Sequence, residues 1–218
     1  MTDPAPEAPR RLSKGERTRA RVLDSAAELF ARSGFLAVSL RDIAAHAGLS
    51  HAGVLHHFPG KEALLLDVLS RRDELDGRRL FPGVLAPCEP EPEPAERLRL
   101  LLDVVDRNTR TPGLVALYAK LSAEASDPEH PAHLYFVRRY QVLRRETTGL
   151  LAELFAAADV REDPAAVAQQ LLALLDGLQT QWLLEPDAVD MAEQVRAFLR
   201  RHGVAAEGRG RGVSGRGR

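Results

Sequence analysis

Apolar residues recur at helical spacing along most of the chain, separated by short clusters of Gly, Pro and polar residues. An apolar stripe over residues 14–33 ends at Gly34, which predicts a helix over that range. Similar stripes predict a helix from Lys61 to Asp76 and later helices over 95–110, 112–126, 131–158, 164–185 and 188–202. Ala and Leu are abundant and β-branched residues are few, so the sequence predicts an all-α fold.

Residues 39–60 show the pattern of two short helices joined by a tight turn. Residues spaced i, i+3, i+4 and i+7 give the first helix one apolar face: Leu40, Ile43, Ala44 and Ala47. Ser39 is its predicted N-cap, Gly48 permits the turn, and Ser50 caps a second helix whose Val54 points back to the first. An ordinary helical hairpin shares this pattern. Because every inward position is apolar or small, we interpret the segment as a DNA-binding helix-turn-helix.

Several motifs in this region resemble the amino-terminal domain of the tetracycline-repressor (TetR) family: Gly34-Phe35, Ser39-Leu40-Arg41-Asp42-Ile43-Ala44, Ala47-Gly48-Leu49-Ser50, His57-Phe58 and Lys61-Glu62-Ala63-Leu64. The resemblance covers about residues 15–75. It implies a homodimeric transcription regulator with a three-helix DNA-binding domain, which binds a palindromic operator, and a larger helical domain for effector binding and dimerisation. The family usually has Tyr where this chain has Leu55, so His56 or His51 is expected to take part of that residue's phosphate contact.

The formal net charge of −1 is unevenly distributed along the chain. Between Arg10 and Lys61, nine Lys and Arg residues face four Asp and Glu residues, which leaves +5 in this segment and −6 in the rest. Four of the seven histidines also lie there: His46, His51, His56 and His57. This asymmetry lets one face attract DNA phosphates while the remainder is repelled.

The predicted DNA contacts lie on and beside the helix-turn-helix: Ser39, Arg41, Ser50, His51, Ala52, Gly53, His56 and Lys61. Ala52 and Gly53 are small enough to let the backbone approach base edges, and His51 can hydrogen-bond guanine N7 or a phosphate. Ser39, Arg41 and Lys61 are predicted to hold phosphates and set the register without reading sequence.

Aromatic and polar residues gather in two parts of the carboxy-terminal half and form the candidate effector site: Tyr118, Tyr135, Phe136, Arg139, Tyr140, Asp176, Gln179 and Trp182. An apolar cavity with a few convergent polar groups is what a small-molecule site requires, although the same aromatics can simply be core. Asp176 lies in a leucine-rich helix and needs a partner if it is buried. We predict Arg139 as that partner, with a donor on the ligand as the alternative.

The helix predicted over 164–185 is apolar on two sides, so two neighbours must cover it. The resemblance implies that this helix and the one over 188–202 form a four-helix bundle with a second subunit. The predicted dimer contacts are Leu171, Leu175, Leu178, Val195, Phe198 and Leu199.

We predict a repressor that a small-molecule effector releases from a palindromic operator. The alternatives are a transcriptional activator and a metal-sensing regulator that binds through His130 and His133. Pro128 and Pro131 interrupt the local helix and no Cys lies near, which disfavours metal binding. The chain has no Gly-x-Ser-x-Gly elbow and no Gly-rich phosphate loop, so we expect neither an enzyme nor a cofactor.

The predicted domain organisation has five parts: an arm over 1–12, the DNA-binding domain over 13–75, a Pro/Glu-rich linker over 76–94, the effector and dimerisation domain over 95–203, and a Gly/Arg-rich tail over 204–218. The single cysteine, Cys88 in the linker, indicates a free thiol and a reducing compartment. The absence of a hydrophobic signal core and of long apolar runs favours a cytoplasmic protein that does not bind membranes.

Overall fold

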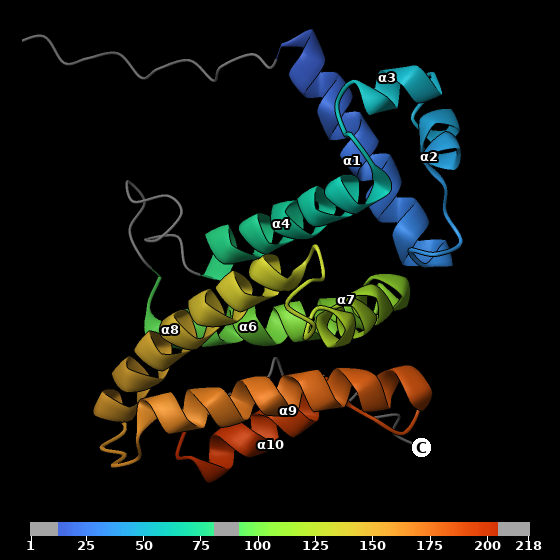
Figure 1. Cartoon of the computed structure of the whole chain (residues 1–218). Helices are drawn as coiled ribbons and strands as arrows, with labels where there is room; N and C mark the ends of the chain where they lie inside the picture. The colour runs from blue at the N-terminus through green and yellow to red at the C-terminus, as the bar shows by residue number, and fades with distance from the viewer. Residues whose placement is uncertain (1–12, 81–91, 205–218) are drawn as a thin grey trace, which may run out of the picture.

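The computed structural model describes residues 13–80 and 92–204, and every regular element in these two ranges is an α-helix. The helices are α1 (Lys14–Ser33), α2 (Leu40–His46), α3 (His51–Leu55), α4 (Lys61–Leu80), α6 (Pro94–Asn108), α7 (Pro112–Glu124), α8 (His133–Ala157), α9 (Pro164–Leu184) and α10 (Met191–Arg201) (Figure 1). The predicted all-α fold is confirmed. Within the described ranges, no helix is long and apolar enough to span a membrane.

The predicted helix boundaries agree closely with the structure, with two informative differences. α1 has the predicted bounds, whereas α4 continues to Leu80, so the first residues of the predicted linker are helical. Val204, predicted to begin the tail, is 3% exposed and belongs to the core. The predicted arm, most of the linker with Cys88, and the rest of the tail lie outside the described residues.

Side-chain caps fix the ends of the amino-terminal helices. Ser13 and Glu16 form a capping box at the start of α1, and Ser39 and Asp42 form another at α2. At the turn between α2 and α3, Gly48 has φ +64°, a conformation that few side chains tolerate. Ser50 then caps α3, and Val54 is fully buried against the domain core. The predicted helix-turn-helix is confirmed.

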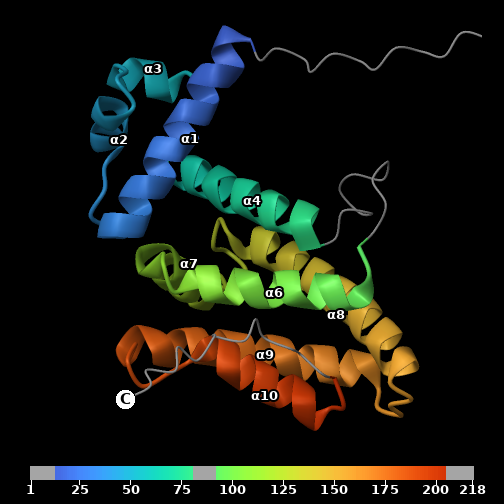
Figure 2. The same ribbon diagram turned by 180° about the vertical axis from the view of Figure 1, so that it is seen from behind.

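The helices are stacked so that α3 and the pair α9–α10 lie at opposite ends of the molecule (Figures 1 and 2). α4 lies between α1 and the layer of α6, α7 and α8, and α10 runs alongside α9 (Figure 2). α4 therefore connects the helix-turn-helix end of the chain to the larger helical domain.

Two hydrophobic cores hold this stack together, and the first crosses the predicted domain boundary. It joins the side chains of α1–α4 to residues of α7 and α8, including Leu117 and Phe136. The second is formed by α6, α7, α8, α9 and α10. The helices α1–α4 thus share a core with the domain that follows them.

A close contact between α1 and α7 reinforces this junction. A Cβ atom added to Gly113 would lie 1.2 Å from the carbonyl oxygen of Ala31 and 2.2 Å from its carbonyl carbon. Only glycine allows the two backbones to approach this closely. Gly113 therefore sets the distance between α1 and α7.

The structure places most of the predicted dimer contacts inside the protomer. Four of them are at most 6% exposed and pack inside the protomer's own second core: Leu171, Leu178, Val195 and Leu199. Leu175 and Phe198 are partly buried and pack against the same core. The helix over 164–185 was predicted to need cover on two sides, and packing against α7, α8 and α10 covers its main apolar stripe within the protomer. A dimer contact through Leu175 or Phe198 stays a prediction.

Candidate DNA interface and effector pocket

Helix α3 has five residues, which is too few for an apolar stripe over several turns. Capping hydrogen bonds therefore fix where it begins. Ser50 accepts a hydrogen bond from the backbone N–H of Gly53 at 3.1 Å, which fixes the first turn. His51, Ala52 and His56 are exposed, while Gly53 is partly buried. Three of the predicted base-reading residues are therefore accessible to DNA. Ser50 also caps α3.

The predicted phosphate contacts Ser39 and Arg41 lie at the start of α2. The Ser39 hydroxyl donates to the Asp42 carboxylate at 2.6 Å, and the Ser39 backbone N–H donates to it at 2.8 Å. These hydrogen bonds hold the pKa of Asp42 below its usual range, because they stabilise the charged form. Ser39 thus serves as a cap, and Arg41 is exposed beside it.

Lys61 has a role inside the domain that sequence analysis did not predict. Its ammonium donates to the carbonyl oxygens of Phe35 and Val38, at 3.0 and 3.1 Å, and lies 4.3 Å from the centre of the Phe35 ring. Lys61 therefore ties the start of α4 to the loop between α1 and α2. Its contact with a phosphate stays a prediction.

This arrangement makes Lys61 a stability residue. We expect Lys61→Ala to lower the free energy of unfolding by about 1–2 kcal/mol, because two hydrogen bonds from a charged donor and a cation–π contact are lost. Urea denaturation measures the loss. Lys120→Ala, at an exposed lysine of α7, is the matched control and should change stability little. Equal losses in the two variants would show that the Lys61 contacts contribute nothing.

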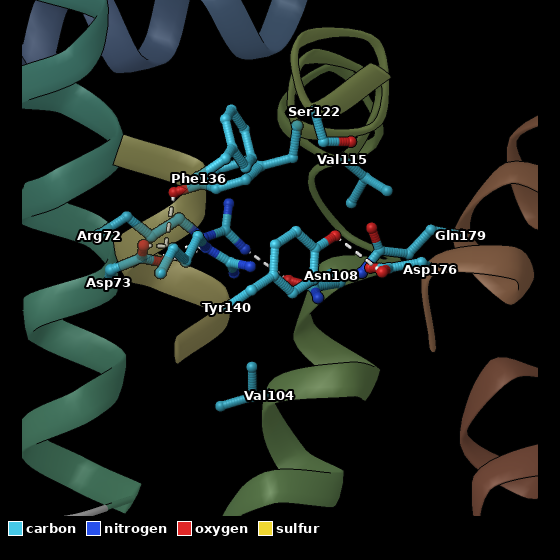
Figure 3. Close-up of a pocket in the computed structure, with 12 residues that line it drawn as sticks. Arg72, Asp73, Val104, Asn108, Val115, Ser122, Phe136, Tyr140, Asp176 and Gln179 are labelled. Carbon is cyan, nitrogen blue, oxygen red and sulfur yellow. Dashed lines mark hydrogen bonds and ion pairs between the residues drawn. The ribbon is translucent and has the colours of Figure 1, made fainter. Parts of the chain in front are cut away.

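A pocket lies where α4, α6, α7, α8 and α9 meet (Figure 3). It holds about 70 Å³ and is lined by Arg72, Asp73, Val104, Asn108, Val115, Tyr118, Ser122, Phe136, Arg139, Tyr140, Asp176 and Gln179. Six of these are predicted effector residues. Figure 3 shows Tyr140 in the middle, between the side chains from α4 and those from α9.

One wall of the pocket is a hydrogen-bond network centred on Asp73 of α4. Its carboxylate accepts from Arg139 Nε at 2.9 and 3.2 Å and from the Tyr135 hydroxyl at 2.6 Å. Tyr118 donates to the Leu69 carbonyl at 3.0 Å and lies 3.4 Å from Asp73. Burial raises the pKa of Tyr118 and Tyr135, and both therefore remain neutral donors.

The opposite wall carries Asp176 of α9, whose carboxylate accepts from the Tyr140 hydroxyl at 2.7 Å. The predicted partner Arg139 is instead ion-paired with Asp73, so that prediction is wrong. Asp176 is exposed as a residue, yet partial desolvation of its carboxyl raises the pKa, although the Tyr140 hydrogen bond and the charge of Arg139 both act to lower it. Among the described residues, no basic group lies within ion-pair distance of this carboxylate.

The sequence matches two family descriptions. Residues 22–68 match "Bacterial regulatory proteins, tetR family", and residues 94–205 match "BetI-type transcriptional repressor, C-terminal". The chain belongs to the TetR family. It is 30% identical over 192 residues to the transcriptional regulator BetI of Rhizobium meliloti, covering 84% of this chain and 89% of that protein.

Solved structures of the TetR family have the same fold. A TetR-family regulator from Streptomyces coelicolor is 26% identical and has a TM-score of 0.64, over 87% of this chain and 96% of that one. A transcriptional regulator from Saccharomonospora viridis, solved in complex with choline, is 26% identical with a TM-score of 0.64, over 86% of this chain and 98% of that one. The chain is thus a DNA-binding transcription regulator of the TetR family.

Two predicted effector residues do not line the pocket of this TetR-family protein. Trp182 is 7% exposed and packs in the second core, so its assignment to the pocket is wrong. Tyr135 is part of the Asp73 network without lining the cavity. Large aromatic side chains on an apolar stripe are more often core than ligand contacts, and Trp182 follows this rule.

His130 and His133 do not form a metal site with their neighbours. His130 Nδ1 accepts from the backbone N–H of Ala132 at 3.1 Å, and His133 Nδ1 lies 2.8 Å from the Ala125 carbonyl oxygen. In the part of the chain that the structure describes, no three His, Cys, Asp or Glu side chains are placed to hold a metal ion. The histidines instead stabilise the turn between α7 and α8.

Six residues that line the pocket were not predicted: Arg72, Asp73, Val104, Asn108, Val115 and Ser122. Asp73 lies one turn after Leu69, on the buried face of α4, and this position is a sequence signal for a buried acid. The other five residues lie at ordinary polar or apolar positions of their helices. Only the packing of α4 and α6 against α7 and α8 brings them together.

Proposed function

We propose that the protein is a transcriptional repressor that binds an inverted-repeat operator as a homodimer and leaves it when a small organic cation occupies the pocket. The family establishes that the chain is a DNA-binding regulator, and the pocket supports the proposed effector. The observation that carries it is the Asp176 carboxylate, which has a hydrogen bond from Tyr140 but no ion-pair partner among the described residues.

Operator binding uses the exposed face of α3, with His51, Ala52 and His56 at the base edges and Arg41 at a phosphate. The positive charge of residues 10–61 supports this arrangement, because it concentrates basic groups on the amino-terminal domain. A helix-turn-helix protein that reads a palindrome does so with two copies related by a two-fold axis. We assign dimerisation to α9 and α10 through outward residues such as Ala173, Gly177 and Gln181, all of which are exposed.

The charges in the pocket support this effector class. Two arginines line it, but Arg139 is ion-paired with Asp73, and Arg72 donates a hydrogen bond to Asn108. An ammonium ion beside Asp176 would pair with that carboxylate while its carbon atoms contact Val115 and Phe136. The relative from Saccharomonospora viridis was solved with choline, which is an ion of this class.

Effector binding is coupled to DNA binding through α4. Arg139 lines the pocket and also holds Asp73 of α4, so a bound molecule contacts a residue that positions this helix. A ligand that favours a different position of α4 changes the distance between the two recognition helices of a dimer. At saturation, such a ligand weakens operator binding by the ratio of its affinities for the two positions of α4.

The test begins with selection of DNA fragments by the pure protein, which yields the operator. Operator affinity and stoichiometry are then measured with choline and with 3,3-dimethyl-1-butanol, its neutral isostere. We expect two chains per inverted repeat, and release by choline but not by the neutral alcohol. Equal effects of the two compounds, or no effect of choline and other small ammonium ions, would exclude a cationic effector.

The Asp176→Asn variant tests whether the Asp176 carboxylate binds the cation, through the affinity for choline and its dependence on pH. We expect it to bind choline at least about tenfold more weakly, because a charge-assisted contact becomes a neutral one. Since burial raises the pKa of Asp176, choline binding by the wild type should weaken as the pH falls through that raised pKa, where the carboxyl loses its charge. Calorimetric titration across the acidic range measures this, and the Asn variant should show no such dependence.

A further inference from the structure

An apolar side chain, Leu55, stands at the end of the recognition helix and is 41% exposed. It lies four residues after His51 and three after Ala52, so the three side chains share one face of α3. His51 and Ala52 are exposed as well. Val54, its neighbour in the chain, is fully buried on the opposite side.

The position of Leu55 differs from that of the other leucines around the turn. Leu40 and Leu49 pack against the core of the domain, whereas Leu55 is exposed beside His51 and His56. α3 lies at the end of the molecule farthest from α9 and α10 (Figures 1 and 2). The side chain is therefore presented on the surface by which α3 is proposed to bind DNA.

We infer that Leu55 is a specificity-determining residue that contacts the C5-methyl group of a thymine in the major groove. This inference rests on the proposed binding of α3 to DNA. The thymine methyl is the one apolar group that base edges present in the major groove, and a leucine beside it removes water from two apolar surfaces. Beside a cytosine, the same leucine would desolvate an amino group without accepting its hydrogen bond. Leu55 therefore selects thymine at one position of each half-site.

The experiment uses the operator obtained by selection, with each thymine replaced in turn by deoxyuridine, which removes only the C5-methyl group. Affinities of the wild type and of Leu55→Ala are measured at one fixed salt concentration. We expect one thymine per half-site at which the wild type loses about fourfold in affinity, the value of one buried methyl group. Replacing this thymine in both half-sites should lower the affinity of the wild type about fifteenfold. The affinity of Leu55→Ala should not change on the same replacement.

Two further variants complete the comparison. Leu55→Met keeps an apolar side chain and should retain the dependence on the methyl group. Leu36→Ala changes a leucine that is 89% exposed in the loop between α1 and α2, and should behave as the wild type. Melting temperatures show whether each variant is folded.

The inference is overturned if the wild type tolerates deoxyuridine at every thymine, as it would if Leu55 touched only deoxyribose. It is also overturned if Leu55→Ala, folded as judged by its melting temperature, loses as much affinity as the wild type at the sensitive thymine. Failure of the proposed function looks different, because no DNA sequence would then be enriched by the wild-type protein.

Discussion

Replacing Asp73 with Ala should lower the free energy of unfolding by about 2–3 kcal/mol, because removing one partner of a largely buried ion pair leaves the other uncompensated. The side chains of Arg139 and Asp73 are only 24% and 31% exposed. Burial acts to lower the pKa of the Arg139 guanidinium, but the charge of Asp73, the neighbouring Tyr118 and Tyr135 and the hydrogen bond to Asp73 together raise it. Arg139 remains charged in the variant because a guanidinium is not deprotonated in proteins, and Tyr135 loses the acceptor of its 2.6 Å hydrogen bond. Urea denaturation measures the loss.

Asp67→Ala is the matched control on the same helix. Asp67 pairs with Arg19 at 2.6 Å, but the two side chains are 41% and 45% exposed. Exposed ion pairs contribute less than about 1 kcal/mol because solvent screens them. Similar losses in the Asp73 and Asp67 variants would mean that the buried network does not hold α4 against α8.

The second large effect is expected for Gly113→Ala, which places a methyl group 1.2 Å from the Ala31 carbonyl oxygen. The carbonyl oxygen and carbonyl carbon of Ala31 are backbone atoms of a packed helix and cannot turn aside, so α1 and α7 must separate. Overpacking of this kind costs about 1–3 kcal/mol, and we expect the upper end of that range. Since α1 belongs to the DNA-binding domain, operator affinity should fall together with the melting temperature. Calorimetry and operator titration measure the two effects.

Gly149→Ala provides the comparison for Gly113. Gly149 lies within α8, and a Cβ there would meet nothing within 4 Å. Ala is favoured over Gly inside a helix by up to about 1 kcal/mol, so this variant should be slightly more stable than the wild type. If both glycine variants were stabilised, the α1–α7 contact would not restrict the position of α1.

The helix-turn-helix could be predicted from sequence because its determinants are local. The caps at Ser39 and Ser50, the positive φ at Gly48 and the buried position of Val54 depend on residues at most a few positions apart. The bounds of α1 follow from its apolar stripe and from Gly34 for the same reason. Local spacing was sufficient for these elements.

The effector site was predicted only in part, since it depends on which helices pack against one another. Tyr118, Tyr140 and Gln179 were identified because polar or aromatic residues stand out in apolar helices. Arg72 and Asp73 were missed because charged residues in an amphipathic helix look solvent-exposed. Trp182 was assigned to the pocket wrongly, since an apolar stripe does not indicate whether a side chain faces the cavity or the core.

The sequence by itself determined the helices, the helix-turn-helix and the family, because periodicity, caps and turn residues act over a few positions. Tertiary structure decided the partners of the charged groups: Lys61 binds two loop carbonyls, Arg139 pairs with Asp73, and Asp176 is left with Tyr140. Each of these contacts joins residues 23 to 66 positions apart. Which charges meet depends on how whole helices pack, and spacing along one helix does not contain that information.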